Sequence, residues 1–95
     1  MLSFDWNPGK ARSNARKHGV TFEEAASVFL DEYAVQFHDE NHDDHEHRFI
    51  MLGLSRRLRL LVVVHAERND GRVIRVISAR KATRREQSYY RPGGK

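Results

Sequence analysis

The second half of the chain alternates short apolar runs with clusters of polar residues and glycine, a pattern typical of strands joined by tight turns. Three runs rich in Leu, Ile and Val lie at Arg48–Leu54, Leu58–Ala66 and Arg72–Ala79. Asp70-Gly71, between the last two runs, favours a hairpin because both residue types tolerate a positive φ. We therefore expect a three-stranded antiparallel meander, preceded by two shorter strands at Leu2–Trp6 and Tyr33–Phe37.

The first half of the chain carries the end signals of two helices. Asn7-Pro8 is typical of an N-cap followed by proline at the first helical position, and Gly19 is typical of a left-handed stop. This helix has only alanines on its apolar side, so we expect it on the surface with a basic face. Thr21 and Glu24 fit a capping box that begins a second helix with an apolar stripe at Phe22, Ala25, Ala26, Phe29 and Leu30.

A third helix is expected near the C-terminus, where Thr83 and Glu86 fit a second capping box. The predicted order is then β-α-α-β-β-β-β-α. This order is typical of an α+β fold in which helices pack on one face of a mostly antiparallel sheet. The 95 residues suffice for a single small domain, residues 1–95, and the end at residues 91–95 is expected to be frayed.

Charge is distributed unevenly along the chain. Residues 1–54 hold five Lys or Arg and ten Asp or Glu, whereas residues 55–95 hold twelve and three. The local balances of −5 and +9 produce the net charge of +4. A basic half of this kind suits a nucleic acid or another polyanion as partner, with scattered surface solvation as the alternative.

Several classes of protein are excluded or disfavoured. The absence of cysteine excludes a disulfide framework, a thiolate nucleophile and a Cys-ligated zinc site. No apolar run approaches the roughly 18 residues that span a bilayer, and the N-terminus lacks a signal-peptide pattern, so we expect a cytoplasmic protein without membrane contact. Four histidines and five carboxylates crowd into residues 38–47, but their spacing matches no metal site. We expect an acidic loop there, and neither a metal nor a cofactor.

The candidate chemistry lies in residues 72–86, where cations interrupt apolar residues. A guanidinium is costly to bury unpaired, whereas on a sheet face its planar fork matches phosphate oxygens. Arg75, Arg80 and Lys81 are therefore candidate contacts to a reacting phosphate. Arg75 and Arg80 have opposite parity, so they cannot both project from one flat face, although Arg80 lies at the strand end. An ion pair with a neighbouring acidic residue is the alternative for Arg75.

His65 and Glu67 are the candidate proton-transfer groups, at a strand end that we expect to open to solvent. A histidine beside a carboxylate and several arginines supplies what RNA cleavage without a metal needs, and a partly buried structural histidine is the alternative. The predicted RNA-binding surface adds further cations and one tyrosine: Lys10, Arg16, Lys17, Arg68, Arg84, Arg85 and Tyr89. The alternative to an enzyme is a non-catalytic nucleic-acid-binding module that uses the same arginines for affinity.

Five ordered blocks extend over about residues 4–90. They are Phe4-Asp-Trp-Asn-Pro-x-Lys10, Asn14-x-x-Lys17-His-Gly-Val20-x-Phe22-x-x-Ala25, Arg48-Phe-x-x-x-Gly53, Val64-His-x-Glu-Arg68 and Ile74-Arg-Val-Ile-Ser-Ala-Arg-Lys-Ala-Thr83-x-x-Glu86. Together these blocks resemble the BrnT family of type II toxins.

The resemblance implies a RelE-like fold and a metal-independent endoribonuclease that inhibits translation. It also implies neutralisation by a cognate BrnA-type antitoxin with a ribbon-helix-helix-like DNA-binding part, so that operator DNA is bound only through the complex. The family supplies no catalytic set for this chain, and the roles of the candidate residues rest on their chemistry alone.

Overall fold

The computed structural model describes residues 2–39 and 47–94 of the chain. Residues 40–46, which make up most of the predicted acidic loop, lie outside the described residues. The described elements are β1 (Ser3–Asp5), α1 (Pro8–His18), α2 (Phe22–Ser27), the 3-10 turn η1 (Val28–Leu30), β2 (Val35–His38), β3 (Arg48–Leu54), β4 (Leu60–Arg68), β5 (Val73–Lys81), α3 (Arg84–Gln87) and the 3-10 turn η2 (Pro92–Gly94). The predicted order is confirmed, with the two 3-10 turns added to it.

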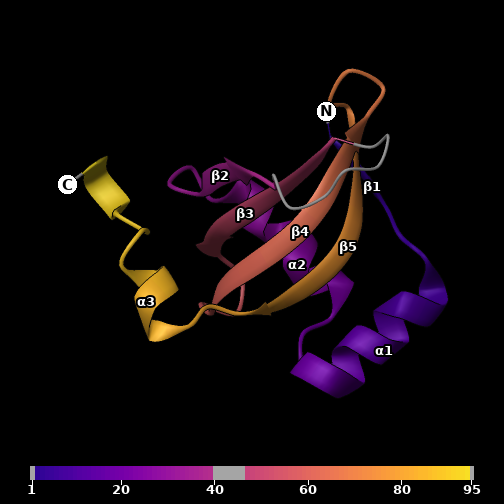
Figure 1. Cartoon of the computed structure of the whole chain (residues 1–95), viewed down its shortest axis with the longest axis horizontal. Coiled ribbons are helices and arrows are strands. Elements are labelled where there is room, and N and C mark those ends of the chain that lie inside the picture. Colours follow the sequence, from indigo (N-terminus) through magenta and orange to yellow (C-terminus); the bar gives the residue numbers. More distant parts are fainter. Residues whose placement is uncertain (1, 40–46, 95) are drawn as a thin grey trace.

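The sheet has the strand order β1-β5-β4-β3-β2 (Figure 1). β2 to β5 form an antiparallel meander, and β1 pairs with β5 in parallel. The hairpin between β4 and β5 turns at Asn69, Asp70 and Gly71, whose φ angles are 52°, 57° and 83°. The predicted hairpin and the α+β fold class with a mostly antiparallel sheet are therefore confirmed.

α1 and α2 cover one face of the sheet, and Figure 1 shows α2 behind β4 and α3 beyond the end of the sheet. The core lies between these helices and the sheet and contains Val20, Phe22, Ala25, Val28, Leu61, Val63, Ile74, Val76 and Ala79. α1 is anchored by the buried Asn14, whose amide donates to the carbonyl of Ala79 at 2.8 Å and accepts from its N–H at 3.1 Å. No helix in the described part of the chain is long and apolar enough to cross a membrane.

The helix ends follow the local signals in the sequence. The side chain of Asn7 accepts from the N–H of Lys10, and Gly19 ends α1 with a φ of 68°. The side chain of Thr83 begins α3, and Glu86 completes the predicted capping box. These three predictions are confirmed, because caps depend on contacts within one turn.

The capping box predicted at the start of α2, from Thr21 and Glu24, is only half formed. The Thr21 hydroxyl accepts from the N–H of Glu24 at 3.0 Å, as predicted. The Glu24 carboxylate instead accepts from Ser55 and Arg59, in the turn between β3 and β4, and is almost fully buried. The prediction that this carboxylate caps its own helix is wrong, because a buried carboxylate is better stabilised by a guanidinium than by one backbone amide.

The apolar stripe predicted for the second helix also differs from the structure at its end, because the chain after α2 forms the 3-10 turn η1. Val28 is fully buried, whereas Leu30 is 88% exposed, so the predicted place of Leu30 in the core is wrong. η1 approaches β3 at Gly53, where an added Cβ would lie only 2.7 Å from a methyl group of Val28. A glycine at this position lets the 3-10 turn pack directly on the strand.

Candidate functional site

A β-bulge in β5 brings Arg75 and Arg80 to the same face of the sheet. Arg75 pairs with Ala66, and Arg80 pairs with Val62, while Ile77 lies at the register shift and has no counterpart. Ala66 and Val62 are four residues apart on β4, so both arginines project from the face opposite α1 and α2. The prediction that their parity separates them is wrong, because the extra residue reverses the alternation.

Each of these arginines is held by a carboxylate on this open face. Nη1 of Arg75 donates to Oδ2 of Asp5 at 2.6 Å, which is the ion pair considered as the alternative for Arg75. Arg80 donates twice to Glu86, at 2.7 and 2.8 Å. The hydrogen bonds from Arg80 lower the pKa of Glu86 to about 2, and Glu86 in turn raises the pKa of Arg80. Both guanidinium groups are therefore oriented by a carboxylate.

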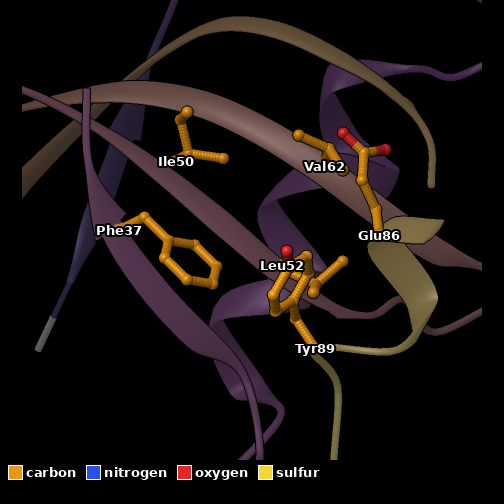
Figure 2. A pocket seen from close by; sticks show the side chains of 6 residues that line it. All are labelled: Phe37, Ile50, Leu52, Val62, Glu86 and Tyr89. Atoms are coloured by element: carbon orange, nitrogen blue, oxygen red, sulfur yellow. The ribbon is translucent and has the colours of Figure 1, made fainter. Parts of the chain in front are cut away.

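An apolar hollow of about 370 Å³ lies on the same face, next to Arg80. Its lining residues come from three strands and the C-terminal segment: Phe37, Ile50, Leu52, Val62, Glu86 and Tyr89. Figure 2 shows the rings of Phe37 and Tyr89 next to each other, and their centroids are 6.1 Å apart in an edge-to-face arrangement. The open face thus combines oriented cations with an exposed aromatic hollow, a combination suited to nucleic acid.

His65 lies on the other face of the sheet and is fully buried. Its ring packs edge-on against Phe29 at 4.8 Å and stacks on Phe49 at 5.7 Å. Neither ring nitrogen has a hydrogen-bond partner within the described residues, and burial lowers the pKa of the imidazole to about 4. The expectation that His65 opens to solvent is wrong, because its alternation with Leu61 and Val63 places it in the core.

The five predicted catalytic residues are divided between the two faces. Glu67 lies near His65, with Oε2 3.9 Å from Nε2, and its side chain is 31% exposed. The pairing of Lys81 with Leu61 places Lys81 on the helix-covered side, where it is exposed at the strand end. Of the five, only Arg75 and Arg80 project from the open face, so the structure does not bring the predicted proton-transfer groups to the predicted phosphate contacts.

The predicted RNA-binding residues do not all line one hollow. Lys10 and Lys17 line a small hollow of about 200 Å³ with Ile77 and Ser78, beside the bulge. Tyr89 lines the larger apolar hollow. The remaining side chains are exposed: Arg16, Arg68, Arg84 and Arg85.

Asp5 and Phe37 belong to the open face but were not among the predicted site residues. Asp5 reaches Arg75 only because β1 pairs with β5 in parallel, 70 residues later in the chain. Phe37 meets Tyr89 only because the C-terminal segment folds back over β2 and β3. No local signal in the sequence indicates either contact. The apolar run that contains Phe37 is compatible with a core position as well.

Comparison with known proteins identifies the family to which this chain belongs. No curated protein matches the chain. The fold is similar to that of the Brucella abortus ribonuclease toxin BrnT, solved at 1.1 Å resolution, with a TM-score of 0.66 and 21% identity over 88% of this chain and 100% of that one. A family model described as the ribonuclease toxin BrnT of type II toxin-antitoxin systems matches residues 6–86. The chain therefore belongs to the BrnT family of type II ribonuclease toxins, as its sequence blocks predicted.

Proposed function

We propose that this chain is a metal-independent endoribonuclease that acts in the cytoplasm, cleaves RNA and thereby inhibits translation. The observation that supports this most directly is the placement of Arg75 and Arg80 on one open face, each oriented by a carboxylate. Two fixed guanidinium groups can contact successive phosphates or stabilise the charge on one phosphate during reaction.

The reaction begins with attack of a ribose 2′-oxygen on the adjacent phosphorus. The new bond joins that oxygen to phosphorus, and the bond from phosphorus to the 5′-oxygen breaks, which leaves a 2′,3′-cyclic phosphate and a 5′-hydroxyl. One group takes the proton of the 2′-hydroxyl, and another supplies a proton to the departing oxygen. Arg75 and Arg80 stabilise the extra negative charge of the pentavalent phosphorane.

Proton transfer requires a group that reaches the RNA. The buried imidazole of His65 does not reach it in the folded protein, and Glu67 lies across the sheet from both arginines. Asp5 lies on the open face, its side chain is 48% exposed, and it already contacts Arg75. Asp5 is therefore better placed than His65 or Glu67 to accept the 2′-hydroxyl proton.

A type II toxin has an antitoxin partner. We propose a BrnA-type antitoxin with a ribbon-helix-helix-like DNA-binding part, so that the complex, and not the toxin alone, binds operator DNA. The +9 balance of residues 55–95 supports a partner that presents carboxylates to the basic side of the toxin.

Cleavage of a purified, end-labelled RNA tests this function directly. The wild-type protein should produce fragments with cyclic phosphate ends, and its expression alone should arrest bacterial growth. Asp5→Asn should slow cleavage about 10²–10⁴-fold if Asp5 transfers the proton. Asp39→Asn is the matched control, because Asp39 lies at the end of β2 and not beside Arg75.

The rival function is RNA binding without cleavage, which uses the same arginines. Salt weakens RNA affinity under both functions, so affinity alone does not separate them. Intact RNA after incubation with folded, RNA-bound protein would favour the binding module and refute the enzyme.

A further inference from the structure

The apolar hollow on the open face joins a buried floor to exposed aromatic rings. Its floor is formed by Leu52 and Val62, which are 2% and 6% exposed. Its walls are the aromatic rings of Phe37 and Tyr89, which remain 38% and 52% exposed. Large aromatic side chains are usually covered in a folded monomer, so two half-exposed rings around a buried apolar floor mark a binding surface.

We propose that this hollow receives one unstacked nucleobase of the RNA that the toxin cleaves, a proposal that rests on the proposed ribonuclease function. A base from single-stranded RNA can lie over the apolar floor and stack on the exposed face of the Tyr89 ring, whose edge-to-face contact with Phe37 holds it in place (Figure 2). The same site would not admit a base that remains stacked in a duplex, so the substrate is single-stranded at this position.

The position of Arg80 favours a nucleotide over an apolar side chain of a protein. Glu86 lines the hollow and accepts two hydrogen bonds from Arg80, which places the guanidinium at the rim. A nucleotide joins an apolar ring to a phosphate, so it satisfies the hollow and the cation together. The neighbouring cations Arg84 and Arg85 are also exposed and can contact the flanking phosphates.

Recognition of the base is expected to depend on stacking more than on hydrogen bonds. Of the six lining residues, only Glu86 and Tyr89 carry polar side-chain groups. Both carboxylate oxygens of Glu86 already accept hydrogen bonds, from Arg80 and from the N–H of Thr83. Stacking is tolerant of base identity, so removal of the base should matter more than its replacement by another base.

The test compares single-stranded RNA substrates of one sequence that differ at one position, where an intact base is replaced by an abasic ribose. The abasic position is moved in turn through the nucleotides that flank the cleaved bond. KM and kcat are measured for the wild type, Tyr89→Leu and Tyr89→Phe. Tyr33→Leu is the matched control, because Tyr33 is similarly exposed at 43% but lines a different cavity.

With intact RNA, Tyr89→Leu should raise KM on the order of tenfold, the loss expected for one base stack, and Tyr89→Phe should stay near the wild type. For the wild type, one abasic position should raise KM by a similar factor, and Tyr89→Leu should no longer distinguish the two substrates. Melting curves of all variants accompany the kinetics. The wild-type arm needs no substitution, so it tests the proposal even if a variant fails to fold.

If the wild type cleaves intact and abasic RNA with the same KM at every position, the hollow does not bind a base and the proposal is wrong, while the ribonuclease function stands. If the wild type cleaves no RNA at all, the proposed function fails first and the proposal fails with it. If Tyr89→Leu leaves cleavage unchanged but weakens binding of the co-expressed antitoxin, the hollow belongs to a protein partner and the proposal is overturned.

Discussion

Two hydrogen bonds, of 2.7 and 2.8 Å, join the guanidinium of Arg80 to the carboxylate of Glu86. Arg80 lies at the end of β5, and Glu86 is the third residue of α3 and part of its capping box. A single ion pair therefore orients a cation on the open face and ties the last helix to the sheet. The aromatic hollow depends on the same link, because Tyr89 follows α3 by two residues.

Replacing Arg80 by alanine should slow RNA cleavage by about 10²–10³, because one preorganised donor to the reacting phosphate is lost. It should also lower the melting temperature slightly, since α3 loses its link to β5. Arg80→Lys should keep the charge but not the two-point contact, and should recover only part of the rate. Arg56→Ala, at an exposed arginine in the turn after β3, is the control. If the folded Arg80→Ala protein cleaves RNA at the wild-type rate, Arg80 does not contact the reacting phosphate.

Replacing His65 by leucine should change the pH dependence of stability. Burial lowers the pKa of His65 to about 4, so the unfolded chain binds a proton on this residue between about pH 6.5 and 4 that the folded protein does not. The wild type should therefore lose about 3 kcal/mol of unfolding free energy from this residue as the pH falls through that range. His65→Leu should not show this loss of unfolding free energy between pH 7.5 and pH 4. Urea unfolding at the two pH values measures it.

The same variant tests the catalytic prediction for His65. Because the imidazole is buried away from Arg75 and Arg80, His65→Leu should retain cleavage in proportion to the folded protein. A loss of about 10²–10⁴ in rate by fully folded His65→Leu protein would instead support proton transfer by His65.

Replacing Glu24 by glutamine should destabilise the protein without altering the open face. The hydrogen bond from Arg59 lowers the pKa of Glu24, and its side chain is only 2% exposed. The loss should lie near the lower end of the roughly 3–5 kcal/mol found for broken buried pairs, because Arg59 retains some contact with water. Glu23→Gln, at the exposed neighbouring residue, should be nearly neutral in the same urea titration.

RNA cleavage should persist in EDTA. No spacing in the sequence builds a metal site, and no group of three His, Asp or Glu residues in ranges 2–39 and 47–94 is arranged to hold a metal ion. Fragment yield with and without the chelator measures this. If EDTA abolishes cleavage and one divalent ion restores it, His42→Ala and His45→Ala would show whether residues 38–47 bind that ion.

A small antitoxin encoded beside this toxin should form a stable complex with it and inhibit cleavage. Carboxylates on the antitoxin that face the basic half would make the association weaken as salt rises. Co-purification at several salt concentrations, followed by the cleavage assay, checks both effects. A neighbouring gene product that never binds the folded toxin would contradict this prediction.

Local features of the fold were predictable from the sequence because each depends on a few neighbouring residues. Asn7 and Gly19 bound α1, Asp70-Gly71 turns the hairpin, and Thr83 begins α3. The apolar runs predicted the strands of the meander within about two residues, and the ordered blocks predicted the family. The concentration of arginines in the second half of the chain also indicated an anionic partner, because net charge is a property of composition and does not depend on the fold.

The candidate site was decided by contacts between distant parts of the chain. A single unpaired residue in β5 reversed the alternation and put Arg75 and Arg80 on one face, which no count of residues along the strand reveals. Burial of His65 depends on aromatic rings from η1 and β3, and the partner of Arg75 arrives from β1. Side-chain direction and burial are set by pairing register and packing across the sheet, so only the tertiary structure determines which chemical groups meet.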